Sequence, residues 1–330
     1  MFSVDAAAVR AGQRRALAKA ITLVESSLPA HREAARALLE ELLPASGNSI
    51  RIGISGVPGV GKSTFIEAFG QLLVARGHRL AVLAVDPSSP VAGGSIMGDK
   101  TRMEALSRDE RVFIRPSPSG GTLGGVAQKT RESMLLCEAA GFDVVFVETV
   151  GVGQSEYQVA GMVDFFMLLM LPGGGDELQG IKKGIMELAH ALVINKADGD
   201  AARLAAIAQS QYQSALSLLH SDTHWQPEVR RCSSLEKKGL EDVWEMIERF
   251  VSSSRASGDF ERQRRRQSRV WMQQLVQRML LDRLESDPAV GAALPDLERA
   301  VEEQLLTPLT AARRVLALLD GEAAPREASA

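Results

Sequence analysis

Cysteine is scarce in this chain of 330 residues, which contains only Cys137 and Cys232. Two thiols are too few for a disulfide framework or for a metal site built from cysteines. Long apolar runs are missing as well, because the longest, residues 165–171, is far too short to cross a bilayer. The N-terminus also lacks the apolar core of a secretory signal. We therefore expect a protein of the reducing cytoplasm that has no membrane partner.

An excess of charge of one sign is also missing. The chain has 38 Lys and Arg against 41 Asp and Glu, a formal net charge of −3. Such a balance creates no general field that would attract a phosphate backbone. Arginines do gather between Arg262 and Arg269, with few aromatic side chains among them. That pattern favours a solvated helix face or an interface, and we expect no nucleic-acid partner.

Residues 56–63, with the sequence GVPGVGKS, match the phosphate-binding pattern G-x-x-x-x-G-K-[ST]. An alternating apolar run precedes them and a helical pattern follows, as this motif requires. The glycines let backbone N–H groups converge on phosphate oxygens, Lys62 would reach the β- and γ-phosphates, and Ser63 would hold Mg²⁺. The residues expected to contact the nucleotide here are Gly56, Pro58, Gly59, Val60, Gly61, Lys62, Ser63 and Thr64.

The tetrapeptide Asn195-Lys196-Ala197-Asp198 follows another apolar run. The Asp198 carboxylate can accept hydrogen bonds from N1–H and the 2-amino group of guanine, whereas adenine would leave it unpaired. Lys196 would lie along the base, and Asn195 would tie this loop to the phosphate loop. Further on, Ser233 would present a backbone N–H to guanine O6, with a helix cap at Ser234 as the alternative. Together with the phosphate loop, these residues predict GTP and GDP as the ligands.

Three acidic residues are candidates for the magnesium site. Asp86 and Glu148 each end an apolar run, and Asp99 lies between them in the sequence. Glu148 stands where many GTPases have the aspartate of D-x-x-G. Oxygen ligands suit Mg²⁺, so we expect Ser63, Asp86, Asp99 and Glu148 around it. Capping of a helix is the alternative for one or two of these acids.

A group that many GTPases use to orient the attacking water is missing. The position after the glycine of D-x-x-G is Val152 rather than glutamine, and Gln154 and Glu156 are nearby but out of register. We therefore expect slow intrinsic hydrolysis of the β–γ bond of GTP. Lys182 is the nearest candidate for an additional catalytic cation, with a solvated lysine as an equal alternative. The expected catalytic residues are Lys62, Asp86, Glu148 and Lys182.

Alternation of apolar runs with helical patterns predicts an α/β fold, a mostly parallel sheet with helices on both faces. The runs are residues 50–54, 80–85, 112–116, 144–147, 163–171, 191–194 and 228–232. We expect an N-terminal extension of two amphipathic helices over residues 1–47 and a GTPase domain over 48–255. The serines at 252–254 and 257 predict a linker. Beyond it, residues 256–330 would form a helical dimerisation region.

Several loops carry a more specific resemblance, to the methylmalonyl-CoA mutase-associated GTPases of the MeaB/ArgK type, within the signal-recognition-particle-like class of P-loop proteins. The segments that resemble this family are Asp86 to Pro90, Gly98 to Met103, Phe113 to Pro118, Thr122 to Gly125, Glu148 to Glu156 and Gly175 to Gly184. The similarity covers about residues 15–250 closely. One departure is Ser119 before Gly120-Gly121, where relatives tend to have a bulkier residue.

This resemblance implies a homodimeric G-protein chaperone that assists the loading and protection of an adenosylcobalamin-dependent acyl-CoA mutase. It also places Asp86, Asp99 and Glu148 around Mg²⁺ and the switch loops, and Lys182 on a third mobile loop. Two other GTPase classes remain as alternatives. A nickel metallochaperone would need histidine-rich or Cys-Pro-His ligands, and a targeting GTPase would need a methionine-rich domain, whereas the eleven methionines here are scattered.

Overall fold

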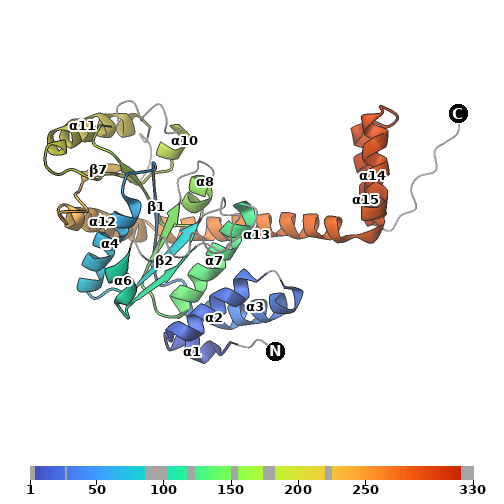
Figure 1. The fold of residues 1–330 in the computed structure, drawn as a ribbon, viewed down its shortest axis with the longest axis horizontal. Coiled ribbons are helices and arrows are strands. Elements are labelled where there is room, and N and C mark those ends of the chain that lie inside the picture. Colours follow the sequence, from blue (N-terminus) through green and yellow to red (C-terminus); the bar gives the residue numbers. More distant parts are fainter. Residues whose placement is uncertain are drawn as a thin grey trace. The chain divides into compact units, whose positions relative to one another are not determined.

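The computed structural model describes residues 4–26, 28–85, 103–116, 123–149, 155–173, 183–219 and 225–320. Its centre is a sheet of seven parallel strands in the order β3-β2-β4-β1-β5-β6-β7 (Figure 1). The strands are β1 (Ile50–Gly56), β2 (Leu80–Val85), β3 (Val112–Arg115), β4 (Val144–Thr149), β5 (Phe165–Met170), β6 (Ala191–Ile194) and β7 (Glu228–Arg231). All seven apolar runs of the sequence form strands, and the predicted parallel α/β fold is confirmed.

Burial explains why these runs lack the alternation of a half-exposed sheet. Every residue of β4, β5 and β6 is buried, because helices cover both faces. β7, at one edge, is less covered, because Val229 is buried whereas Glu228 and Arg230 are partly exposed and Arg231 is exposed. A parallel sheet needs crossover helices, and these supply the cover on each face.

One face of the sheet is covered by α4 (Lys62–Ala75), α6 (Glu104–Arg108) and α12 (Leu240–Ala256). Aromatic side chains fill the space between them and the strands. The ring of Phe69 stacks on that of Phe146, with centroids 5.7 Å apart, and meets Trp244 edge-on. The helix that begins at the phosphate loop is therefore held firmly against the sheet.

The opposite face is covered by α7 (Leu123–Ala139), α8 (Ser155–Ala160), α10 (Lys183–Met186) and α11 (Ala201–Leu219). The N-terminal helices pack outside α7 (Figure 1). There are three of them, α1 (Ala6–Arg10), α2 (Arg14–Glu25) and α3 (Pro29–Leu42), followed by a short 3₁₀ turn, η1 (Leu43–Ala45). The prediction of two helices was wrong, because the chain turns at Gly12, whose φ is +72°.

A buried carboxylate joins the N-terminal segment to the sheet. The side chain of Glu138, on α7, is fully buried and accepts hydrogen bonds from the Ser49 hydroxyl (2.6 Å) and the Gly47 N–H (2.9 Å). Arg51 of β1 donates to it through Nε and Nη2, each at 2.8 Å. A bidentate pair of this kind is strong and directional.

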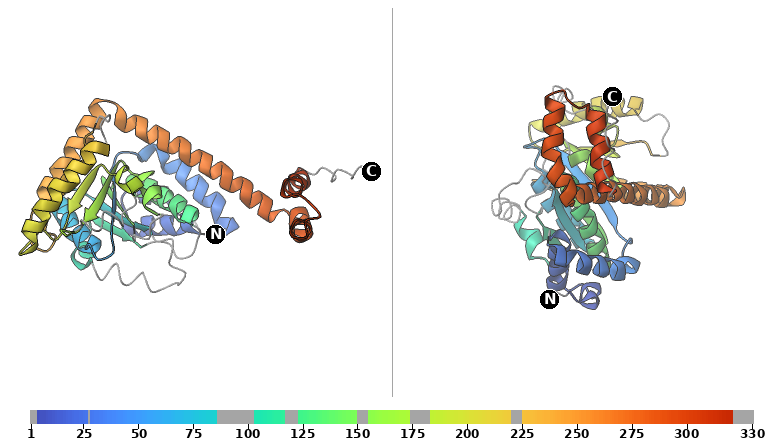
Figure 2. Two further views of the ribbon diagram at one scale, coloured as in Figure 1. Left: turned by 90° about the horizontal axis from the view of Figure 1, so that it is seen from above. Right: turned by 90° about the vertical axis from the view of Figure 1, so that its right-hand side faces the viewer.

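The C-terminal helices are α13 (Asp259–Ser286), α14 (Pro288–Glu302) and α15 (Pro308–Leu319). Contacts within the chain divide it into two compact units, Met1–Gln263 and Arg264–Ala330. Within the second unit, α14 and α15 lie side by side (Figure 2). No helix among the described residues combines the length and the apolar character needed to cross a membrane.

The serine-rich stretch at residues 252–254 is not a linker, which corrects the prediction. These residues continue α12, and Ser254 is only 1% exposed. The helix breaks only at Ser257 and Gly258, where Gly258 has a φ of +72°. Directly afterwards, Phe260 is buried in the core of the first unit. Small hydroxyl side chains fit a helix interface, so serine content alone did not indicate a loop.

We expect Glu138→Ala to destabilise the protein by about 3–5 kcal/mol, because it removes the bidentate partner of the largely buried Arg51 guanidinium. Chemical denaturation followed by circular dichroism would measure this change. The matched control is Glu33→Ala, which removes a surface carboxylate paired with Arg36 and should change stability little. Equal effects of the two substitutions would contradict the assigned role of Glu138.

Candidate nucleotide-binding site

The expected nucleotide contacts converge at the carboxyl ends of the central strands. β1 lies between β4 and β5, so the chain leaves β1 where the strand order reverses. Ligands of open α/β sheets bind at this topological switch point. In the register of the sheet, Glu148 lies beside Ile54 on one side and beside Ala84 on the other. The phosphate loop and the end of β4 are therefore adjacent.

The phosphate loop depends on glycine at two positions. A Cβ on Gly56 would come within 2.6 Å of the Leu169 carbonyl oxygen, so β5 leaves no room for a side chain. Gly61 has a φ of +89°, and a Cβ there would lie 3.1 Å from Asn195 Nδ2. α4 begins at the next residue, Lys62. The loop therefore ends at a helix N-terminus, where backbone N–H groups favour anions.

Lys62 lies within the loop and is partly enclosed. Its Nζ donates a hydrogen bond to the carbonyl oxygen of Gly56 at 2.8 Å. Burial lowers the pKa of Lys62, while the carboxylates of Glu148 and Glu156 act in the opposite direction. A cation influenced by the charges of two acids matches the needs of a site for triphosphate and a divalent metal ion, in which charges of both signs must be balanced.

The two carboxylates that act on the pKa of Lys62 come from two elements. Glu148 ends β4 and is 7% exposed, and Glu156 lies in the first turn of α8. Next to Glu148, the Thr149 hydroxyl donates to that of Ser55 at 2.8 Å, which ties β4 to β1. The sequence motifs assign no role to Glu156, because its influence on Lys62 depends on where the fold places α8.

Oxygen donors on two elements would suit Mg²⁺. Glu148 supplies a buried carboxylate and Ser63 a hydroxyl at the start of α4, both hard ligands of the kind this ion prefers. The other expected ligands, Asp86 and Asp99, lie outside the described residues, as does Lys182. Among the residues that the structure describes, no three His, Cys, Asp or Glu side chains lie close enough together to hold a metal ion.

Asn195 joins the phosphate loop to the base loop, which consists of residues 195–198 after β6 and residues 232–239 after β7. Its side chain is buried, and Nδ2 donates to the Val60 carbonyl oxygen at 2.9 Å. Its Oδ1 accepts from the hydroxyl and the N–H of Ser234, at 2.7 and 3.2 Å, and lies 3.6 Å from the Cys232 thiol. Ser234 therefore serves this network rather than capping a helix, since α12 begins only at Leu240.

The remaining residues of the base loop are also held in place. Lys196 adopts a φ of +57° and donates through Nζ to the Gly59 carbonyl oxygen at 2.8 Å. Ser233 donates its hydroxyl to the carboxylate of Asp198, and its N–H to the Lys238 carbonyl oxygen at 3.0 Å. The structure thus brings Asp198, Lys196 and Ser233 to the same edge of the sheet as the phosphate loop.

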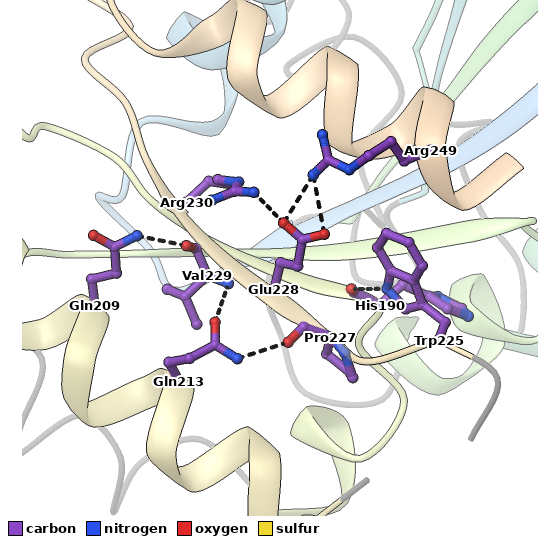
Figure 3. Close-up of polar contacts among 9 residues, drawn as sticks. All are labelled: His190, Gln209, Gln213, Trp225, Pro227, Glu228, Val229, Arg230 and Arg249. Atoms are coloured by element: carbon purple, nitrogen blue, oxygen red, sulfur yellow. Dashed lines mark hydrogen bonds and ion pairs between the residues drawn. The ribbon is translucent and has the colours of Figure 1, made fainter. Parts of the chain in front are cut away.

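Side chains from two helices secure the edge strand that leads into Ser233 (Figure 3). Gln213 accepts from the N–H of Val229 at 2.9 Å, and Gln209 donates to its carbonyl oxygen at 2.7 Å. On α12, Arg249 pairs with Glu228 at 3.0 Å. These contacts satisfy backbone groups that an edge strand would otherwise leave open. They fix where β7 ends and hence where the part of the base loop that contains Ser233 begins.

A parallel sheet with a phosphate loop and an N-K-x-D loop at one edge defines a P-loop GTPase. A family model described as "Methylmalonyl Co-A mutase-associated GTPase MeaB" matches residues 17–289. The chain belongs to this family, which confirms the resemblance seen in the sequence.

The relatives agree with this assignment. "GTPase ArgK" of Escherichia coli K12 is 51% identical over 308 residues, covering 93% of each chain. "Methylmalonic aciduria type A homolog, mitochondrial" of Mus musculus is 48% identical, covering 92% of this chain and 76% of the mouse protein. A crystal structure described as "LAO/AO transport system kinase" superposes with a TM-score of 0.75 at 43% identity, covering 96% of each chain. The chain is a GTPase of this family.

Replacing Asp198 by Asn should weaken GTP binding and improve the binding of xanthosine triphosphate, because the amide reverses the donor and acceptor pattern toward the base edge. Fluorescent GTP, ATP and XTP would be titrated against both proteins. Asp200→Asn, at an exposed position two residues further on, is the matched control and should bind as the parent does. A parent protein that binds ATP and GTP equally well would refute the assignment of guanine recognition.

Proposed function

We propose that this protein is a GTP-dependent chaperone that assists cofactor loading and protects an adenosylcobalamin-dependent acyl-CoA mutase of the methylmalonyl-CoA mutase type. The observation that supports the client most directly is the family itself, which is described as mutase-associated. The hydrogen bond that joins the base loop to the phosphate loop supports the proposal that GTP and GDP are the ligands. We place this activity in the cytoplasm.

In the proposed reaction, the residues of this chain bind and orient the triphosphate. Asp198, with Lys196 along the base, holds the guanine, and the phosphate loop with Lys62 holds the β- and γ-phosphates. Mg²⁺, bound by Ser63 and Glu148 and by the proposed further ligands Asp86 and Asp99, would neutralise charge on the transferred phosphoryl group. Water then attacks the γ-phosphorus, the bond from this phosphorus to the oxygen that bridges to the β-phosphate breaks, and GDP, inorganic phosphate and a proton are released. Lys182 is the proposed additional cation for the transition state.

Slow unaided hydrolysis suits a timed switch. Val152 stands where a water-orienting glutamine would be, so the triphosphate state would persist until a partner completes the site. If the client binds the two nucleotide states unequally, linkage requires nucleotide and client to affect each other's affinity. A GTPase with these properties can report whether its client is correctly loaded.

We also propose that the protein is a homodimer, formed through the region from residue 256 to the C-terminus. α13 has Met272, Val276, Met279 and Leu280 on one helical stripe, and all four are exposed. In α15 and the turn before it, Leu305 and Leu309 are also exposed. An apolar stripe of this size on a soluble helix needs cover, and a second copy of the chain would provide it through a two-fold interface.

The double variant Met279→Glu/Leu280→Glu should convert the full-length dimer to a monomer that still binds GTP, because it places charges within the proposed interface. Sedimentation velocity at micromolar concentration would measure the mass. A second test is truncation after Arg266, which keeps the buried Phe260 and the hydrogen bond from Gln263 to the Val163 carbonyl oxygen. Gln274→Glu, an exposed position on the opposite side of the same helix, is the control and should leave the dimer intact. A full-length parent that sediments as a monomer would refute the dimer.

A purified methylmalonyl-CoA mutase, or a close acyl-CoA mutase from the same cell, should raise the GTP turnover of this protein. Unaided turnover should be slow, roughly 10⁻⁴–10⁻² s⁻¹. Lys182→Ala should reduce the mutase-stimulated rate more than the basal rate, whereas Glu148→Ala should reduce both. Phosphate release would be followed with and without the mutase. If no complex forms in any nucleotide state and the rate does not change, the protein remains a GTPase with another client.

A further inference from the structure

Two buried hydroxyl groups join the strand that enters the phosphate loop to the strand that carries Glu148. Thr149 follows Glu148 at the end of β4, and its hydroxyl donates to that of Ser55 at 2.8 Å. Ser55 is 2% exposed and Thr149 is fully buried. The paired residues of β1 and β4 end with Ile54 beside Glu148. The hydroxyl pair therefore continues the contact between the two strands by one residue, through side chains instead of backbone groups.

The layer around this pair is apolar. Gly53 lies on the same face of β1 as Ser55, and a Cβ there would come within 2.7 Å of Phe166 Cδ2. On β4, Val147 has the same relation to Thr149 and is fully buried. A hydrogen bond between two buried hydroxyls adds little net stability over an apolar pair of the same shape. Its particular contribution is a fixed distance and direction between the two strand ends.

This pair lies directly before the first residue of the phosphate loop. Gly56 follows Ser55, and its carbonyl oxygen accepts a hydrogen bond from Lys62 Nζ at 2.8 Å. On its other side, Gly56 lies so close to β5 that a Cβ would come within 2.6 Å of the Leu169 carbonyl oxygen. The start of the loop is therefore fixed from both neighbouring strands, by the hydrogen bond toward β4 and by close packing toward β5.

We propose that Thr149 is a positioning residue for GTP hydrolysis. Through its hydrogen bond to Ser55, it holds the Glu148 carboxylate at a set position relative to the phosphate loop. Only one peptide bond separates each hydroxyl residue from the candidate site, Thr149 from Glu148 and Ser55 from Gly56. Small displacements of groups in such a site lower reaction rates strongly. This proposal rests on the proposed role of Glu148 as a ligand of Mg²⁺.

The test compares the full-length variants Thr149→Val and Thr149→Ser with the parent. Valine keeps the shape of threonine without the hydroxyl, so kcat for GTP should fall about tenfold while KM changes less than about twofold. Serine keeps the hydroxyl and should hydrolyse GTP nearly as the parent does. The valine variant should also need more Mg²⁺ for half-maximal hydrolysis. In direct titrations, Mg²⁺ should increase its GDP affinity less than it increases that of the parent.

Thr130→Val is the matched control. Thr130 of α7 is also buried, and its hydroxyl donates to the Val126 carbonyl oxygen at 2.9 Å within the same helix. The substitution should lower the melting temperature at either position, but only Thr149→Val should change kcat and the magnesium dependence. A Thr149→Val protein that melts earlier yet keeps the parent kcat and magnesium dependence would show a purely structural role and overturn the proposal.

The double variant Ser55→Ala/Thr149→Val separates positioning from stability. Each single change leaves one buried hydroxyl without its partner, whereas the double variant leaves none, so its melting temperature should recover toward that of the parent. Its kcat should stay low, because an apolar pair has no directional contact. Recovery of kcat together with the melting temperature would refute the positioning role. If Thr149→Val alone does not fold, the double variant carries the test.

Glu148→Ala, measured alongside, distinguishes two kinds of failure. If this variant keeps the parent kcat and magnesium dependence, the proposed role of Glu148 is wrong, and Thr149 has no catalytic group to position. If Glu148→Ala is impaired while Thr149→Val behaves as the parent does, Glu148 keeps its proposed role and only the positioning by Thr149 is refuted.

Discussion

The site depends on one buried amide. Asn195 donates to the phosphate loop at Val60 and accepts from Ser234 in the loop after β7. Three segments far apart in the sequence therefore share one side chain whose hydrogen bonds are made away from water. A buried donor or acceptor left without a partner costs about 1–3 kcal/mol, so each segment is held in its position by the other two.

This amide connects these segments only because the sheet already brings them to one edge. Parallel strands end on the same side, and the strand order reverses at β1. The phosphate loop and the acid at Glu148 follow adjacent strands, and Asn195 follows a strand two places from β1. The aromatic contacts of Phe69 hold α4 on one face, while Glu138 and Arg51 secure the far end of β1. Packing thus fixes the strand ends from which these loops begin.

The sheet and the loop motifs could be predicted from the sequence because both are local patterns. Apolar runs mark buried parallel strands wherever they occur, and the spacing of glycines around Lys62 carries its own chemistry. The errors concern residues whose role depends on distant partners. Ser254 is helical because its small side chain fits a buried interface. The helix cap at Ser234, which the sequence left open as an alternative, is not formed, because Ser234 donates to Asn195. The hydrogen bonds from the N–H groups of Ala105 and Leu106 to Glu67 could not be predicted either, because these partners lie about forty residues away in the sequence.

The C-terminal helices begin directly after α12, because the serines at 252–254 belong to that helix and form no linker. Because α12 runs on to Ala256 and only two residues separate it from α13, the chain has little slack there. The first turn of α13 is anchored by Phe260 and by the hydrogen bond from Gln263 to Val163. Val163 belongs to the turn that follows α8. Arg131 also holds this turn, because it donates a hydrogen bond to the Gly161 carbonyl oxygen at 3.2 Å. The start of α13 and the end of α8 are therefore both held at the same turn of the chain, residues 161–163.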